Sequence, residues 1–363
     1  MKQKLLMSAA MIGMMGSLGL STAHAEWDSG VKLNLGGYFK GYLSYVDQDY
    51  AAGKSSHRVD MLRTTEVHFD GKTTLDNGLT VGTHIEGQAD GGDDFFVDES
   101  YLFFSGEWGK LNLGRTYGAP YILQVIAPAA DSNIDGRLQL IQPVNFAASG
   151  LNTAIFTSTY ETDYDHDISA KIDKITYISP LFQGLQSAVS YTPDGSTTSR
   201  GTSGNATDND ATERSDIWEW AVRFENKVND SFTYAIGTGY SKAQAETSAL
   251  NDREAWNAGI DLNIGQFGIG AAYHVDDVGS ADDDIQYAVV GADYTNGDFV
   301  YGASYYNKND DVNLVDLNRY SAGVTYKVIP GLSFRASGHY YDIEEGSTNV
   351  DATALLFGTD IKF

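Results

Sequence analysis

The sequence contains no cysteine, only 6 proline residues, and only 24 lysine and arginine residues against 49 acidic residues. The absence of cysteine excludes disulfide bonds, a thiol nucleophile and zinc sites of the finger type. A formal net charge of −25 argues against a nucleic-acid partner, because phosphate binding requires basic patches. After Leu20 the chain has no run of about 18 apolar residues, so we expect no transmembrane helix there.

The N-terminus has the three parts of a cleavable secretory signal. It begins with the basic residues Lys2 and Lys4, continues with the apolar stretch 5–20 and ends in Ala23-His24-Ala25. A buried N-terminal helix is the alternative, but the Ala-x-Ala site stands where the polar chain begins. We therefore predict a signal peptide at residues 1–25 and a mature chain of residues 26–363, which is exported across one membrane.

A period of two residues runs through the mature chain. In the stretch 332–341, Leu332, Phe334 and Tyr340 fall on one face, whereas Ser333 and His339 fall on the other. The same alternation is found in residues 218–225, 232–240, 256–264 and 320–328. Alternation of this kind is typical of strands, and no helical period follows residue 25. The chain is therefore predicted to be all-β.

Short turns alternate with long polar segments along the chain. The compact turn signals are at residues 76–78, 107–109, 180–184, 229–230, 265–266, 296–297 and 330–331. The long segments are 50–57, 90–94, 193–216, 242–252, 276–284, 307–316 and 342–351. Seven hairpins, with a first strand at 31–45 and a last strand at 353–363, make sixteen strands. This layout predicts a 16-stranded antiparallel transmembrane β-barrel whose two rims face different compartments.

Soluble β-folds explain the pattern less well. A sandwich or jelly roll would pack its apolar faces inward, around a dry core. Here the polar faces are rich in Gly, Ser, Asn and charged residues, which suits a water-filled lumen. The apolar faces are rich in Tyr, Phe and Trp, which suits the two interfaces of a membrane.

Three motifs and the C-terminus resemble the general-diffusion porins of Gram-negative outer membranes, which are trimers of 16-stranded barrels. Residues 99–121 (ESYLFFSGEWGKLNLGRTYGAPY) resemble that family's fourth and fifth strands, which lead into its constriction loop. Residues 65–79 resemble its second strand and first turn, and residues 174–184 its sixth strand and third turn. The chain ends in Phe363 with Ile361 two residues before it, similar to the terminal signal that the barrel-assembly machinery reads.

The resemblance implies a function and a cellular location. It implies a passive, water-filled channel for small hydrophilic solutes and ions, located in the cell outer membrane. It further implies a homotrimer in contact with outer-membrane lipid and lipopolysaccharide, with no enzymatic activity and no cofactor.

One connection, residues 117–170, is far longer than the others. A loop of this length demands a function or disorder, and its apolar residues allow it to pack. The resemblance implies a constriction loop that folds into the lumen and presents acidic side chains, for which Asp131 and Asp135 are the candidates. Ordinary solvated loop acids are the alternative. The later part, 161–167, is expected either inside the lumen or at the outer surface.

The resemblance also implies a basic cluster on the pore wall opposite this loop. Lys40 and Arg115 fall on basic positions of that pattern. Glu66 and Ile178 stand where the pattern usually has basic residues, and Asp70 replaces a common lysine. The basic wall is therefore expected to be weakened.

Alternation places Arg115 on the same outward face as Leu111 and Leu113. A charge at mid-membrane would cost about 2–4 kcal/mol. We therefore expect a bend at Gly114, or the end of regular pairing, to turn Arg115 into the pore.

Alternation adds His68, His84 and Glu86 to the pore wall. Further lumen candidates are Tyr101, Arg223, Asp261, Lys327, Arg335, His339 and Lys362. Because the mature chain is acidic and its basic wall is weakened, we predict that the channel prefers cations.

Loop acids form weak candidate sites for a structural Ca²⁺ ion. The candidates are Asp93, Asp94, Asp282, Asp283 and Asp284, since hard cations favour carboxylate oxygens. No complete calcium-loop spacing is present, and such clusters are more often solvated charges at loop tips than metal sites.

Two other functions stay open at this point. A substrate-selective channel, for sugars for example, would show a line of aromatic residues in the lumen, to which Tyr38, Tyr42, Tyr101 and Tyr341 are candidates. An outer-membrane barrel hydrolase would need a Ser or Asp/His constellation on one rim, but the chain lacks Gly-x-Ser-x-Gly and His-Glu-x-x-His.

Overall fold

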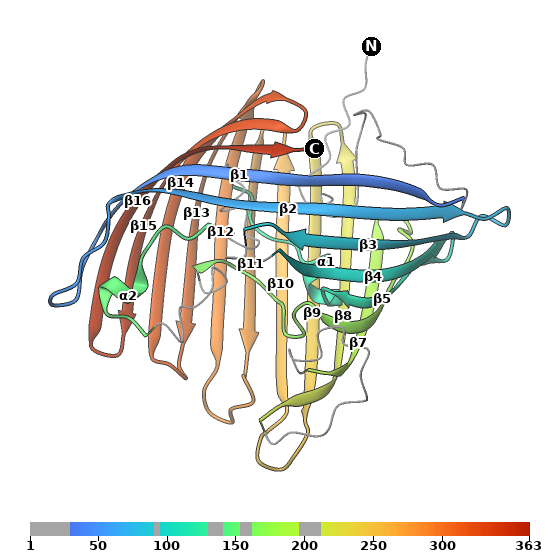
Figure 1. Cartoon of the computed structure of the whole chain (residues 1–363), viewed down its shortest axis with the longest axis horizontal. Coiled ribbons are helices and arrows are strands. Elements are labelled where there is room, and N and C mark those ends of the chain that lie inside the picture. The colour runs from blue at the N-terminus through green and yellow to red at the C-terminus, as the bar shows by residue number, and fades with distance from the viewer. Residues whose placement is uncertain (1–29, 91–94, 130–140, 153–161, 196–211) are drawn as a thin grey trace.

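The computed structural model describes residues 30–90, 95–129, 141–152, 162–195 and 212–363. These residues form one closed barrel of sixteen antiparallel strands, each paired with its neighbours in sequence (Figure 1). The barrel closes where β1 (Lys32–Gln48) pairs with β16 (Thr348–Lys362). The backbones of Gly37 and Phe363 exchange two hydrogen bonds at this seam. The predicted fold class is confirmed, whereas the predicted signal peptide lies outside the described residues.

The other strands follow in chain order around the barrel. They are β2 (Val59–Thr74), β3 (Thr80–Gln88), β4 (Phe96–Gly106), β5 (Gly109–Thr116), β6 (Ile172–Ile178), β7 (Leu185–Asp194), β8 (Arg214–Asn229), β9 (Phe232–Ala245), β10 (Arg253–Ile264), β11 (Phe267–Asp276), β12 (Ile285–Asn296), β13 (Phe299–Asp310), β14 (Val315–Ile329) and β15 (Leu332–Glu345).

The short turns fall where the sequence predicts them, between β2 and β3 and between each later pair of strands in the same alternation. Two of the predicted long loops, 307–316 and 342–351, are wrong. The strands β13 and β14 are separated by only residues 311–314, and β15 and β16 by only residues 346–347. The polar residues at these strand ends resemble loop residues in the sequence. In the structure they form hydrogen bonds between neighbouring strands, as from Asn307 to Asn318 (3.0 Å).

The two faces of the wall differ as the alternation predicts. On β8, Trp218 and Trp220 are exposed on the outside, whereas Glu219 and Arg223 are buried on the inside. No helix in the described part of the chain is both long and apolar enough to cross a bilayer.

Outward aromatic rings form two bands around the barrel. One band lies at the loop end, where the longer connections join the strands, and includes Tyr191, Trp218, Trp220, Tyr240, Trp256 and Tyr273. The other band lies at the turn end, where the short turns join the strands, and includes Trp108, Tyr177, Phe232, Tyr234, Phe267, Tyr294, Phe299 and Tyr326. On β9 the two bands are represented by Tyr240 and Phe232, which are separated by about 27 Å of strand. Strand tilt reduces this to about 20 Å, close to the apolar band of a membrane barrel.

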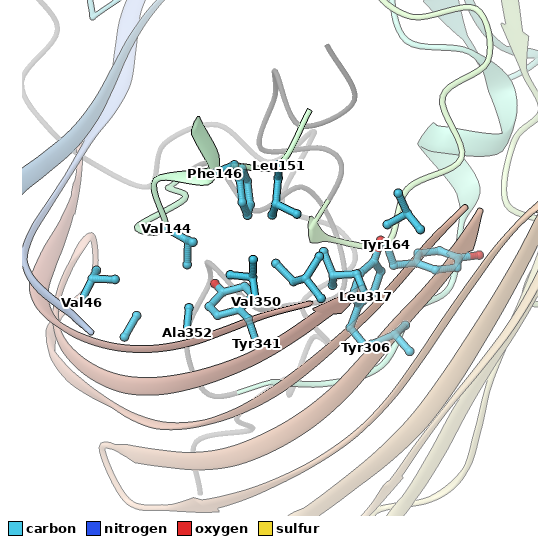
Figure 2. Close-up of a cluster of buried hydrophobic side chains, with 14 of the residues drawn as sticks. Val46, Val144, Phe146, Leu151, Tyr164, Tyr306, Leu317, Tyr341, Val350 and Ala352 are labelled. Atoms are coloured by element: carbon cyan, nitrogen blue, oxygen red, sulfur yellow. The ribbon is translucent and has the colours of Figure 1, made fainter. Parts of the chain in front are cut away.

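The described parts of the long connection between β5 and β6 lie inside the barrel. They contain two short helices that the sequence pattern did not predict, α1 (Ala119–Leu123) and α2 (Phe146–Ser149). Figure 2 shows Val144, Phe146 and Leu151 of this loop near apolar side chains that β13 to β16 and β1 direct inward. The wall contributes Val46, Tyr306, Leu317, Tyr341, Val350 and Ala352. An apolar core therefore lies between the loop and one side of the wall.

Glycines on the inner wall let the first part of the loop lie directly on the sheet. A Cβ atom on Gly259 of β10 would stand 1.8 Å from the carbonyl oxygen of Val125. A Cβ atom on Gly291 of β12 would stand 2.3 Å from the carbonyl oxygen of Pro128. A side chain at either position would displace the loop, so these inward glycines are packing residues as well as lumen surface.

Candidate pore constriction

Strand register gathers charged side chains on one side of the lumen. In the β2–β3 hairpin, His68 pairs with Glu86 and Asp70 with His84. Glu86 pairs in turn with Glu99 of β4, and a bulge at this point adds Asp98. We call these seven residues the wall cluster: Glu66, His68, Asp70, His84, Glu86, Asp98 and Glu99. The predicted wall residues Glu66, His68, His84 and Glu86 are thus brought together.

The two histidines bridge the carboxylates of the cluster. The His68 Nε2 atom lies 3.4 Å from Glu66 Oε2 and 3.5 Å from Glu86 Oε2. The His84 Nδ1 atom lies 2.8 Å from Asp70 Oδ1, and its Nε2 atom lies 3.7 Å from Glu86 Oε2. Glu66 and Glu86 are buried, so these contacts are partly shielded from water.

Lys171, which the sequence reasoning missed, supplies a positive charge to this cluster. Its Nζ atom lies 3.3 Å from Glu86 Oε1 and 3.7 Å from Glu99 Oε1, and it also contacts Asp98. Burial opposes the lysine charge, but the three carboxylates outweigh it and hold the pKa of Lys171 above its ordinary value. Lys171 is the last residue of the inward loop, so alternation carried no signal for it.

Lys40 and Arg115 occupy different settings. Lys40 is buried on the inner face of β1, with its Nζ atom 5.4 Å from the centre of the Tyr38 ring. The Arg115 guanidinium donates through Nε to the Lys171 carbonyl oxygen (2.7 Å) and through Nη1 to that of Val97 (3.3 Å). The pore-wall roles of Lys40 and Arg115 stay predictions.

The backbone departs from ordinary strand conformation just before Arg115. Gly114 has a φ of 130°, and β5 pairs with β6 as far as Thr116 but with β4 only as far as Arg115. Asn112 and Thr116 remain buried on either side of it. Besides the two carbonyl groups, the guanidinium lies 4.0 Å from Asp98 Oδ1, and its turn into the pore stays a prediction.

Asp131 and Asp135, the predicted loop acids, lie outside the described residues. The later part of the loop, however, is buried, which decides against its emergence at the outer surface: Thr162, Asp163 and His166 are fully covered. Burial raises the pKa of Asp165, reinforced by Asp167 and Asp163. Burial likewise raises the pKa of Asp167 to about 7, although Lys174 opposes the shift.

Of the loop acids proposed for calcium, only Asp282, Asp283 and Asp284 lie in the described part of the chain. Asp93 and Asp94 lie outside the described residues, and Asp282, Asp283 and Asp284 hydrogen-bond mainly within their own loop. Within the described ranges, two sets of three possible ligands have their atoms within 4.8 Å of one another. They are Glu66, His68 and Glu86, and Asp194, Glu213 and Glu246. Structural Ca²⁺ at the predicted acids therefore stays a proposal.

Serine and histidine do meet inside the barrel, but in an order that does not suit hydrolysis. Ser241 Oγ lies 2.8 Å from His166 Nε2 and donates to Glu219 Oε1 at 3.1 Å. In a serine hydrolase the carboxylate orients the histidine, not the serine. His339 instead lies between the hydroxyls of Ser321 and Ser337, each 3.0 Å away.

The two histidines of the wall cluster are part of a row of rings on the inner face of the barrel. Ring centres of Tyr38 and His68 are 6.2 Å apart, those of His68 and His84 are 5.6 Å apart, and those of His84 and Tyr101 are 5.2 Å apart. This row runs across four strands, around the barrel rather than along its axis. Tyr42 and Tyr341, the other lumen candidates, are fully buried.

Comparisons with known proteins agree with this architecture. A family model described as Gram-negative porin matches residues 9–346. An uncharacterized protein of Rickettsia conorii is 23% identical over 340 residues, which cover 73% of this chain and 76% of that protein. A Rickettsia prowazekii protein, also uncharacterized, is 24% identical over 342 residues, with the same coverage.

Solved structures show the same fold. The anion-selective porin from Comamonas acidovorans superposes with a TM-score of 0.63 at 15% identity, covering 92% of this chain and all (100%) of that one. An engineered variant of the Rh. blastica porin superposes with a TM-score of 0.57 at 18% identity, covering 91% of this chain and 100% of that one.

Proposed function

Because this chain belongs to the family of Gram-negative porins and is an outer-membrane β-barrel that forms a channel, we propose that it conducts small hydrophilic solutes and ions passively, with a preference for cations. The observation that carries the preference is the wall cluster. It presents five carboxylates, and in the described contacts Lys171 meets three of them while histidines meet Glu66 and Asp70. Carboxylates along a pore lower the barrier for a cation and raise it for an anion.

The fold does not by itself decide ion preference. The Comamonas acidovorans porin is named anion-selective and has the same fold at 15% identity. Side chains on the lumen must therefore set the sign. Glu66 is one such side chain, since it stands where the resemblance to the porins implies a basic residue. The full chain has 49 acidic against 24 basic residues, and this excess of negative charge adds an attractive field for cations.

A reversal-potential measurement tests this proposal. The purified protein is inserted into planar bilayers and the current is recorded across an about tenfold KCl gradient. We expect the zero-current potential to have the sign that indicates K⁺ preference. Its magnitude should be less than the value of about 59 mV for an ideally selective pore. The preference should weaken at high salt, since ions screen the carboxylates. A potential of the opposite sign would refute cation preference and leave the porin assignment intact.

We further propose a homotrimer that contacts outer-membrane lipid and lipopolysaccharide. The lipid contact is supported by the outward apolar surface, which continues onto strands on all sides of the barrel, and the trimer by the resemblance to the trimeric porins. The proposal that the barrel-assembly machinery reads the C-terminus rests on Phe363 and Ile361, both exposed. Native mass spectrometry of detergent-extracted protein tests the oligomeric state: a mass three times that of the chain is expected, and a monomer under every mild detergent would contradict it.

A sugar-selective channel is the second candidate. The row of rings from Tyr38 to Tyr101 favours it, because sugars stack on aromatic faces, but a row around the wall supplies no path along the pore. Sugars added during recording decide the matter. Saturable reduction of conductance by one sugar would establish selectivity, whereas equal effects of sugars of equal size would favour general diffusion.

We propose that the protein is not an enzyme. The proposal is supported by the porin family and by the hydrogen-bond order around Ser241, in which the carboxylate meets the serine. Ester hydrolysis by purified protein, lost in Ser241→Ala without loss of conductance, would overturn it.

A further inference from the structure

We propose that Glu66, His68 and Glu86 form a binding site for a divalent transition-metal ion such as Zn²⁺ on the lumen wall, and that metal bound there lowers the conductance of the pore. The three side chains come from the neighbouring strands β2 and β3, which lie side by side in the barrel (Figure 1). Their ligand atoms all lie within 4.8 Å of one another. The conductance part of the proposal rests on the proposed channel function, whereas the binding part does not.

The spacing of the ligand atoms fits a tetrahedral ion. Bonds of about 2.0–2.1 Å place two ligands of a tetrahedral Zn²⁺ about 3.3 Å apart. His68 Nε2 stands 3.4 Å from Glu66 Oε2 and 3.5 Å from Glu86 Oε2. An ion could therefore replace these two contacts of His68 with only small movements of the side chains. The fourth position would be open to water, because His68 is only partly buried.

A neighbouring histidine is already oriented in the way that metal sites use. His84 Nδ1 lies 2.8 Å from Asp70 Oδ1, and its Nε2 atom is directed toward the same Glu86 Oε2 atom, at 3.7 Å. A carboxylate on the far nitrogen of a histidine fixes its tautomer and strengthens it as a ligand. His84 can therefore serve as a fourth ligand after a small shift, or orient Glu86 through a hydrogen bond.

The charges of the site also suit a divalent cation. Glu66 and Glu86 together neutralise two positive charges. Lys171 binds the other oxygen of Glu86, Oε1, and its charge is shared with Asp98 and Glu99. Because Glu66 and Glu86 are buried, their attraction for a cation is less screened than at an exposed loop.

The donor set selects among metals. One imidazole nitrogen and carboxylate oxygens suit Zn²⁺ and related ions, whereas Ca²⁺ prefers six to eight oxygen ligands and Mg²⁺ retains much of its water. The cluster of Asp194, Glu213 and Glu246 has oxygen donors only and lacks a histidine. It therefore does not carry the same inference.

Calorimetry of the mature, EDTA-treated porin in detergent tests binding, with ZnCl₂ in one arm and MgCl₂ or CaCl₂ in the others. We expect one Zn²⁺ per chain at this site, and at least about tenfold weaker binding after His68→Gln or Glu66→Gln. His57→Gln, in the exposed loop before β2, is the matched control and should bind as the unaltered protein does. Unchanged binding in His68→Gln, or equal binding of Mg²⁺, would overturn the site.

Single-channel recording tests the effect on the pore. Zn²⁺ should lower the conductance of the unaltered protein and of His57→Gln but not of His68→Gln. An equal reduction in His68→Gln, or by Mg²⁺, would show general screening and overturn the inferred effect. If the protein binds Zn²⁺ yet forms no channel, the site stands and the proposed function fails. If it conducts but binds no Zn²⁺, only the metal site fails.

Discussion

Arg319 of β14 and Asp163 of the inward loop form an ion pair in which both side chains are completely buried, with 3.1 Å between Nη2 and Oδ1. The guanidinium also donates to the carbonyl oxygen of Thr162 and lies 5.1 Å from the centre of the Tyr306 ring. The contacts of Arg319 with Thr162 and Asp163 join residues more than 150 positions apart in the chain. They hold the later part of the loop against the wall beside the apolar core.

We expect Asp163→Asn to loosen this attachment, because it leaves the Arg319 charge buried beside a neutral partner. Breaking a buried ion pair from one side costs up to about 3–5 kcal/mol. Open-channel noise should increase, and protease should cleave near residue 163 more rapidly. Lys227→Met, which breaks the exposed pair of Lys227 with Asp230, is the control and should change neither measurement. Equal effects of both substitutions would mean that the buried pair does not anchor the loop.

We expect Gly259→Val to lower single-channel conductance. The new side chain would require the space of the Val125 carbonyl group, so the loop would be pushed away from the wall and into the pore. Gly338→Ala on β15 is the control, since its Cβ would meet the flexible end of Leu355 at 3.3 Å and would lie 4.0 Å from the Ala354 carbonyl oxygen. Unchanged conductance in a folded Gly259→Val protein would show that the loop rests elsewhere in solution.

The loop around Asp167 should loosen as pH rises. Burial raises the pKa of Asp167 from 3.8 to about 7, so the protonated carboxyl favours the folded loop. This stabilisation is fully present below about pH 3.8 and is lost as pH rises through about 7, at no more than about 1.4 kcal/mol per pH unit.

Hydrogen exchange of backbone amides in residues 162–171 measures this effect at about pH 5.5 and about pH 8.5. Asp167→Asn, compared at each pH, corrects for the intrinsic pH dependence of exchange. The unaltered protein should lose protection relative to this variant at the higher pH. Parallel behaviour of the two proteins would contradict the prediction.

Charge reversal at Glu66 should weaken cation preference. Glu66→Lys places a positive charge on the buried inner face of β2, and we expect the zero-current potential in a KCl gradient to move toward zero or change sign. Recordings are made with EDTA, which separates this effect from metal binding. Asp230→Lys, at an exposed turn, is the control of equal charge change. An equal shift in both variants would assign the preference to net charge and not to the wall cluster.

Part of the wall cluster could have been placed from the sequence alone. The turn at Asp76-Asn77-Gly78 puts His68 and Glu86 at equal distances from Asn77, and these residues are paired in the structure. Asp70 and His84 are related in the same way. The position of the turn fixes the register of the hairpin. The turn in the sequence therefore predicts that Glu66, His68 and Glu86 lie close together, which alternation alone does not.

Other members of the site had no such signal. Lys171 follows a long loop, and its position depends on where that loop rejoins the sheet. The two wrong loop predictions, 307–316 and 342–351, have a related cause. Polar residues were read as loops, although a strand beyond the membrane needs only backbone pairing and polar cross-strand contacts to persist.

The sequence by itself determined the number of strands, their inward and outward faces and the turn-end hairpins, because each depends on alternation and turn chemistry over a few neighbouring residues. Only the tertiary structure decided that Gly37 meets Phe363 at the seam, that the loop rests on Gly259 and Gly291, and that Arg319 pairs with Asp163. These contacts join distant segments, whose positions depend on closure of the whole barrel and on packing inside it.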